Sequence, residues 1–158
     1  MGTFGTGPFS SDGALDLLDK LTGQSVGRRR EVLEGIFLQV RDRPGLLGRK
    51  FFPDEVVAAA AVVAAGMAGG EDIRRDLAGQ GYGISAVLVP GPDSALCAFA
   101  LEALLAAAGR DGPWHSGWAD PETAAEARQA TDRLAAILVR KGHLRERVTS
   151  SPVVCACR

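Results

Sequence analysis

The stretch that decides the fold is "PDEVVAAAAVVAAGM", residues 53–67. Pro53 suits the first turn of a helix, and Asp54 and Glu55 place negative charge at the positive end of that helix. The thirteen residues that follow, 56–68, carry no charge and leave no polar face. Because a helix that is apolar on every side must be buried, this segment predicts the central helix of a helical bundle.

Four further helices are predicted by capping residues followed by apolar residues at helical spacing. Ser10 or Ser11 suits the cap of the first of these helices, Asp93 or Ser94 suits a later one, and Asp120 suits the last. The expected ranges are about 11–22, 28–42, 93–109 and 120–142, and residues 71–79 add one or two turns.

The helix expected over 28–42 opens with three arginines, Arg28, Arg29 and Arg30. Cations at the positive end of a helix are unfavourably placed unless they are solvated or bind an anion. We interpret the three side chains as a solvated corner of the molecule, and an anion site is the alternative.

The segment "QGYGISAVLVPGP", residues 80–92, is rich in glycine, proline and β-branched residues, which is typical of extended chain. Its one candidate partner is "VVCAC" at 153–157, and a ribbon of two strands is only marginally stable. The sequence therefore predicts an all-α, single-domain bundle of about five helices with a long extended connection near 79–92. The helical domain covers 1–142, and 143–158 form a C-terminal tail for which an extended strand is one interpretation.

Composition excludes several classes of partner. A chain of 158 residues with a formal net charge of -1 can bury one core and carries no large positive field, so we expect no nucleic-acid partner. The longest apolar run has thirteen residues, whereas a membrane span needs about twenty, so we expect no membrane partner. Three cysteines form an odd count, and the N-terminus lacks the pattern of a secretory signal, so we expect a cytoplasmic location.

The opening "MGTFGTGPFSSDGALDLLDKL", residues 1–21, resembles the start of a bacterial family, domain of unknown function 4259. Members typically begin with Gly-Trp-Gly-Gly-Phe followed by Asn-Asp-x-Ala-x-Asp. Phe4 stands here in place of the usual Trp, and Ser11 in place of the usual Asn. The resemblance implies a small, mostly helical bacterial protein and supplies no established catalytic residue. The matching positions are Gly2, Gly5, Gly7, Phe9, Asp12, Ala14 and Asp16.

The same opening holds the first candidate site. Asp12 and Asp16 lie one helical turn apart, so they form a candidate carboxylate pair for acid–base or metal chemistry. In the alternative interpretation Asp12 is a first-turn charge and Asp16 pairs with Lys20. Phe4 and Phe9 are candidate binding residues, or else they fold back onto the bundle as an apolar plug beside the helix cap.

The second candidate site is the loop "PWHSGWAD", residues 113–120. Loops that combine aromatic rings with an imidazole and a hydroxyl often bind ligands, so Trp114, Ser116 and Trp118 are candidate binding residues and His115 is a candidate acid–base group. The tryptophans would otherwise plug one end of the bundle.

We expect no metal and no cofactor, because a closed zinc site usually has four ligands. The residues that would have to be tested as metal ligands are His143, Cys155 and Cys157.

These observations favour an accessory or interaction protein, because the helices are uniformly apolar and few groups could perform catalysis. The expected partner is another protein or a second copy of the chain. A protein partner would be a larger enzyme of bacterial specialised metabolism or a toxin that the chain neutralises. One rival hypothesis is a small enzyme or enzyme subunit that uses Asp12, Asp16 or His115, and another is a small-ligand binding protein.

Overall fold

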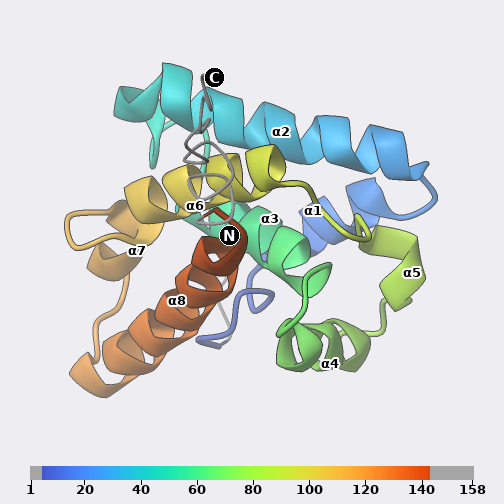
Figure 1. Ribbon diagram of the computed structural model, residues 1–158. Helices are drawn as coiled ribbons and strands as arrows, with labels where there is room; N and C mark the ends of the chain where they lie inside the picture. Colours follow the sequence, from blue (N-terminus) through green and yellow to red (C-terminus); the bar gives the residue numbers. More distant parts are fainter. Residues whose placement is uncertain (1–4, 143–158) are drawn as a thin grey trace, which may run out of the picture.

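The structure, a computed structural model, describes residues 5–142, and these residues fold into α-helices joined by short connections (Figure 1). Within that range the chain has no β-strand beyond an isolated bridge between Leu47 and Phe51, so the all-α prediction is confirmed. Six of the helices have nine or more residues and two have four, which is more than the five expected. In chain order they are α1 (Asp12–Leu21), α2 (Val26–Asp42), α3 (Pro53–Ala65), α4 (Glu71–Gly79), α5 (Ile84–Val87), α6 (Ser94–Ala108), α7 (Pro113–Ser116) and α8 (Pro121–Gly142), with a 3-10 turn η1 (Pro44–Leu46). The expected tail, 143–158, lies outside the described residues.

Helix α3 occupies the centre of the bundle, as its sequence predicts. All ten residues from Val56 to Ala65 are buried, and α3 packs against α1, α2, α4, α6, α7 and α8. Figure 1 shows α2 and α6 running above α3, α8 crossing in front of it, and α4 and α5 at one end. No side of residues 56–65 meets solvent, which agrees with the absence of a polar face in this stretch of α3.

Small side chains set how closely α3 and α6 approach each other. The buried face of α6 carries Ala100, Ala103 and Ala107, and α3 contributes six alanines of its own, all fully buried. An alanine pays no side-chain entropy on folding and lets two helix backbones come close together. Larger side chains at these positions would have to displace a neighbouring helix.

The helix starts agree with the predicted caps. The side chains of Ser11, Asp93 and Asp120 accept hydrogen bonds from backbone N–H groups of Ala14 (3.1 Å), Leu96 (2.9 Å) and Thr123 (2.8 Å), respectively. Caps of this kind contribute about 1 kcal/mol each to helix stability. In three of the longer helices, a local capping hydrogen bond thus sets the residue at which the helix begins.

The long connection predicted near 79–92 is present between α4 and α6, but it is not extended throughout. Helix α4 continues to Gly79, and the single-turn α5 interrupts the remainder. The expectation of extended chain came from glycine, proline and β-branched residues, but Val87, Leu88 and Val89 are buried against the bundle and have no strand partner among residues 5–142. Burial alone explains the composition of this segment.

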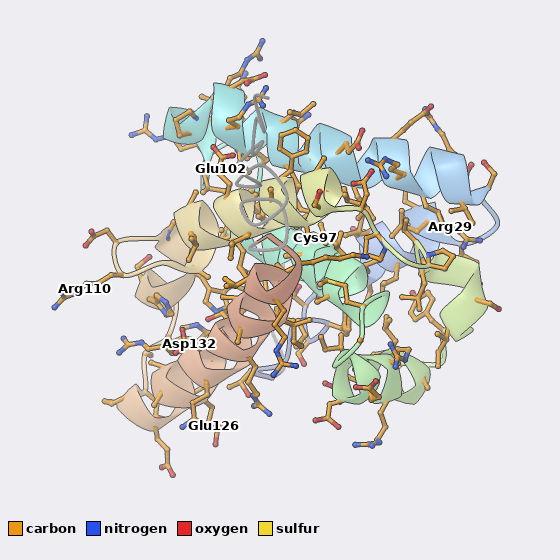
Figure 2. The ribbon with its side chains drawn as sticks, in the orientation of Figure 1. Arg29, Cys97, Glu102, Arg110, Glu126 and Asp132 are labelled. Carbon is orange, nitrogen blue, oxygen red and sulfur yellow. The ribbon has the colours of Figure 1, made fainter. Side chains whose placement is uncertain are left out.

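The backbone carbonyls of this segment bind an arginine, which corrects the prediction of a solvated corner. Arg29 is buried, and its Nη1 donates hydrogen bonds to the carbonyl oxygens of Ser85 (2.8 Å) and Leu88 (2.9 Å). Figure 2 shows Arg29 on the side of the bundle where α2 faces α5. Of its neighbours, Arg28 stays exposed and pairs with Glu31 at 2.8 Å. A guanidinium can donate to several carbonyls at once, so Arg29 supplies these carbonyls with the hydrogen bonds that a neighbouring strand would supply in a sheet.

Two further observations complete the fold. The loop predicted at 113–120 contains the single-turn helix α7, which lies at one end of the bundle beside α6 and α8 (Figure 1). Among the described helices, none combines the length and the apolar character that a membrane span requires.

Candidate functional site

Two adjoining cavities lie at the N-terminal end of α3, and Phe52 and Asp54 line both of them. We refer to the pair as the Asp54 groove. The cavities have volumes of about 340 and 330 Å³, each within the range of small-ligand sites. The charged half is lined in addition by Gly13, Asp16, Leu17, Lys20, Lys50 and Glu55, and the aromatic half by Pro53, Pro113, Trp114, Gly117 and Trp118.

The start of α3 places the two shared residues. Phe52 precedes the helix in an extended conformation, with φ of -108° and ψ of 145°, and its side chain is 39% exposed. Pro53 then begins the helix, and Asp54 and Glu55 occupy the first turn, where carboxylates are stabilised by the helix dipole. The same residues that predict the central helix therefore also build the groove.

The charged half combines three carboxylates, from Asp16, Asp54 and Glu55, with the ammonium groups of Lys20 and Lys50. Burial raises the pKa of Glu55, the charge of Lys20 opposes this, and the charges of Asp54 and Asp16 add to the increase. Glu55 therefore keeps its proton to a higher pH than an ordinary glutamate.

The carboxylate of Asp54 lies directly against α1. A Cβ atom added to Gly13 would overlap Asp54 Oδ2, so a larger residue at position 13 would require this carboxylate to move. Gly13 and Asp54 thus lie against each other where α1 meets α3 at the groove.

The aromatic half is formed by the two tryptophans of the chain. The ring centroids of Trp114 and Trp118 lie 5.6 Å apart and the ring planes are inclined by 76°, which is an edge-to-face arrangement. Trp114 is 6% exposed and Trp118 is half-buried, and neither buried indole N–H has a hydrogen-bond partner in the described part of the chain. The pair presents two rigid walls beside the exposed ring of Phe52.

Three of the candidate residues named from the sequence meet in this groove. Asp16 lies in the charged half, and Trp114 and Trp118 lie in the aromatic half. Ser116 is exposed, and its Oγ donates to the carbonyl oxygen of Pro113 at 2.8 Å. Phe9 is a core residue with 1% exposure, so it presents no surface to a partner. Phe4 lies outside the described residues.

The candidate acid–base groups are not gathered in one place. His115 lines a different cavity, of about 800 Å³, between α6 and α8, whereas Asp16 lines the Asp54 groove. His115 Nε2 lies 2.7 Å from the carbonyl oxygen of Ala108, so Nε2 must carry the hydrogen, and the buried Nδ1 has no hydrogen-bond partner among residues 5–142. Asp12 is exposed on the first turn of α1. Asp16 forms no ion pair with Lys20 within 4.0 Å in residues 5–142, contrary to the alternative interpretation.

The part of the chain that the structure describes holds no arranged site for metal binding or thiol chemistry. Over residues 5–142 no three histidine, cysteine, aspartate or glutamate side chains converge so that they could hold a metal ion. The ligands proposed for testing, His143, Cys155 and Cys157, lie outside that range. Cys97 is buried near the centre of the bundle with its Sγ 3.5 Å from Met67 Sδ (Figure 2), and burial raises the pKa of its thiol. A thiol in such surroundings is chemically inert.

Five charged or aromatic residues of the groove are absent from the candidates that the sequence suggests: Lys20, Lys50, Phe52, Asp54 and Glu55. The stretch "KFFPDE", residues 50–55, contains four of them and shows a usable signal, because it places aromatic rings and charges directly before a capped apolar helix. The sequence alone indicates the helix start but not that α1 and α7 close around it.

The fold and the groove together define an all-helical protein with an aromatic and charged surface groove beside its central helix. A sequence model of the family described as "Domain of unknown function (DUF4259)" matches residues 2–130, and the chain belongs to this family. The matched range contains every residue that lines the groove. Searches of the curated proteins and of the solved structures found no match to the chain.

Proposed function

We propose that this chain is a small accessory or interaction protein that docks a segment of a protein partner in the Asp54 groove. The observation that supports the proposal is the gathering of Phe52, Trp114 and Trp118 at one groove, where Phe52 is among the few large apolar side chains left exposed. Aromatic residues are enriched in protein interfaces, and tryptophan is prominent among the residues that carry most of the binding energy.

The partner that we propose is a larger enzyme of bacterial specialised metabolism or a toxin that the chain neutralises in the cytoplasm. The net charge of -1 gives no support to a nucleic-acid partner. Self-association through the same groove is the competing outcome, and the experiment below separates it from a heterologous complex.

An enzymatic role has less support from the geometry. Two side chains can serve as the acid and the base of one reaction only when both lie within hydrogen-bond reach of the same substrate. Asp16 and His115 line separate cavities, so they cannot act on the same bond in this arrangement.

The proposal is tested by capture of the partner from cells that natively produce the protein. The full chain, Phe52→Ala and Leu105→Ala are each tagged and purified from those cells, and circular dichroism checks that all three are folded. Leu105 is the matched control because it is apolar, 55% exposed and part of a different cavity.

We expect a stoichiometric partner with the unchanged chain and with Leu105→Ala, and a much smaller yield with Phe52→Ala. Equal recovery from all three proteins would contradict docking in the groove. Recovery of the chain alone, as a dimer that Phe52→Ala dissociates, would replace the heterologous partner by a second copy.

A further inference from the structure

The charged side chains of the Asp54 groove form no ion pair with one another within residues 5–142. Elsewhere, arginines of α2 and α4 form ion pairs, such as Arg30 with Asp93 and Arg75 with Asp72, both at 2.8 Å. Asp54 makes no hydrogen bond and no ion pair within residues 5–142, although Lys20 and Lys50 line the same half of the groove. A partly buried carboxylate without a partner favours a cation beside it.

The aromatic half supplies the second element of a cation site. Asp54 is the one charged residue among those that line this half, where it stands beside Phe52, Trp114 and Trp118. A cation near the face of an aromatic ring is attracted by the ring quadrupole, and tryptophan gives the strongest attraction. The inclination of 76° between the two indole planes gives the cavity two differently oriented walls.

The arrangement also selects the shape of the cation. A lysine or arginine side chain has an apolar stem and a charged head, and the stem packs on apolar surfaces while the head seeks a polar group. The aromatic half would hold the stem, and Asp54 lies where this half meets the two further carboxylates of Asp16 and Glu55. Carboxylates outnumber ammonium groups in the groove by three to two, which disfavours an acidic partner segment.

We infer that the Asp54 groove binds a cationic side chain of the partner, a lysine or an arginine, with its stem on the tryptophans and its head group at Asp54. This inference rests on the proposed docking function and specifies the chemistry of the docked segment.

The two tryptophans allow a direct measurement, because both line the groove and no other tryptophan contributes to the fluorescence. The full chain is titrated at constant ionic strength with n-butylammonium, which mimics a lysine side chain. The comparison probes are 1-butanol, which is neutral and of the same length, and butanoate, which is anionic. Titrations are confined to concentrations at which the far-UV circular dichroism does not change.

We expect n-butylammonium to change the tryptophan fluorescence in a saturable manner and to bind about ten-fold more tightly than 1-butanol. Asp54→Asn should remove this preference and leave the binding of 1-butanol unchanged. Asp132→Asn is the matched control, because Asp132 is an exposed carboxylate on α8 that lines a different cavity (Figure 2), and it should behave like the unchanged chain.

Equal affinity for n-butylammonium and 1-butanol, tighter binding of butanoate, or no saturable response to any probe would each overturn the inference. The docking proposal is tested separately by the capture experiment with Phe52→Ala. A partner that is lost with Phe52→Ala but retained in full with Asp54→Asn would refute the cation site and leave the docking function standing.

Discussion

The two ends of helix α3 have opposite environments. From Val56 to Ala65 every residue is buried and no side chain carries a charge, whereas the first turn and the residue before it hold Phe52, Asp54 and Glu55, all of which line a groove. One continuous helix therefore serves as the centre of the core at one end and as a wall of the candidate site at the other. The groove residues are therefore attached to a helix that is otherwise buried on every side, which fixes their position relative to the core.

The sharpest test of this contrast is a charge placed in the buried half of α3. In Ala60→Asp the carboxylate would lie at a position with 0% exposure and no cationic neighbour on α3. We expect the free energy of unfolding to fall by more than about 4 kcal/mol, which removes most of the stability of a domain of this size. Urea denaturation followed by circular dichroism measures the loss, and a cooperative transition close to that of the unchanged chain would contradict a buried α3.

Arg29 holds the segment 84–88 against the bundle through two hydrogen bonds to its carbonyls. In Arg29→Met the carbonyls of Ser85 and Leu88 lose their donor while they remain buried or partly buried, so we expect a loss of about 2–3 kcal/mol. Arg28→Met is the matched control, because its ion pair with Glu31 is exposed and contributes about 0.5 kcal/mol. The two midpoints of denaturation are compared, and equal shifts would show that the buried contacts of Arg29 do not hold the segment 84–88.

Gly66, the residue that follows α3, contacts Val89 and Gly91, which come directly after the segment 84–88. Its N–H and carbonyl groups take part in the turn, Gly91 N donates to Gly66 O at 3.3 Å, and a Cβ on Gly66 would overlap the carbonyl oxygen of Val89. We expect Gly66→Ala to destabilise the fold by about 1–3 kcal/mol. Gly35→Ala in α2, where a Cβ meets open space, should instead stabilise it by about 0.5–1 kcal/mol. Shifts of the same sign would refute the close approach at Gly66.

A smaller effect is expected where the connection after α4 meets α1. Burial, the hydrogen bond from Tyr82 OH to Asp19 Oδ1 (2.6 Å) and the negative charges of Asp19 and Asp16 raise the pKa of Tyr82 to about 12. The unfolded chain releases this proton near pH 10, so the free energy of unfolding should be unaffected by Tyr82 below pH 10 and should fall between pH 10 and about 12.

Tyr82 is the one tyrosine of the chain, so its tyrosinate absorbance can be titrated directly. In the folded protein we expect little tyrosinate at pH 10, and Asp19→Asn should move the transition toward the ordinary value. An unchanged titration in Asp19→Asn would show that the carboxylate does not hold the phenol.

The sequence predicts the elements of the bundle better than their contacts. The caps at Ser11, Asp93 and Asp120 are local, and each lies within three residues of its partner, so the longer helices could be recognised. The long-range contacts could not be recognised. Arg29 donates to carbonyls 56 and 59 residues away, in the connection that the sequence predicts to be extended and that contains a single helical turn.

The same limit applies to the groove. Trp114 and Trp118 can be recognised as candidates because tryptophan is rare and the two lie close together, and Asp16 is one of the positions that carry the resemblance to the family. Phe52 and Asp54 are informative only once α1, α3 and α7 are known to meet at one place. Tertiary packing thus decides which of several plausible residues share a site.

Photo-cross-linking from the N-terminal end of α3 tests most directly whether this end is the docking surface. The photoreactive residue p-benzoylphenylalanine replaces Phe52 in one protein and Val26 in another, where Val26 is an apolar residue of α2 that is 45% exposed. Both proteins are irradiated in cells that natively produce the chain. We predict a single heterologous adduct from position 52 and none from position 26. Adducts of equal yield from both positions, or an adduct from position 26 alone, would contradict the assignment of the Asp54 groove as the docking site.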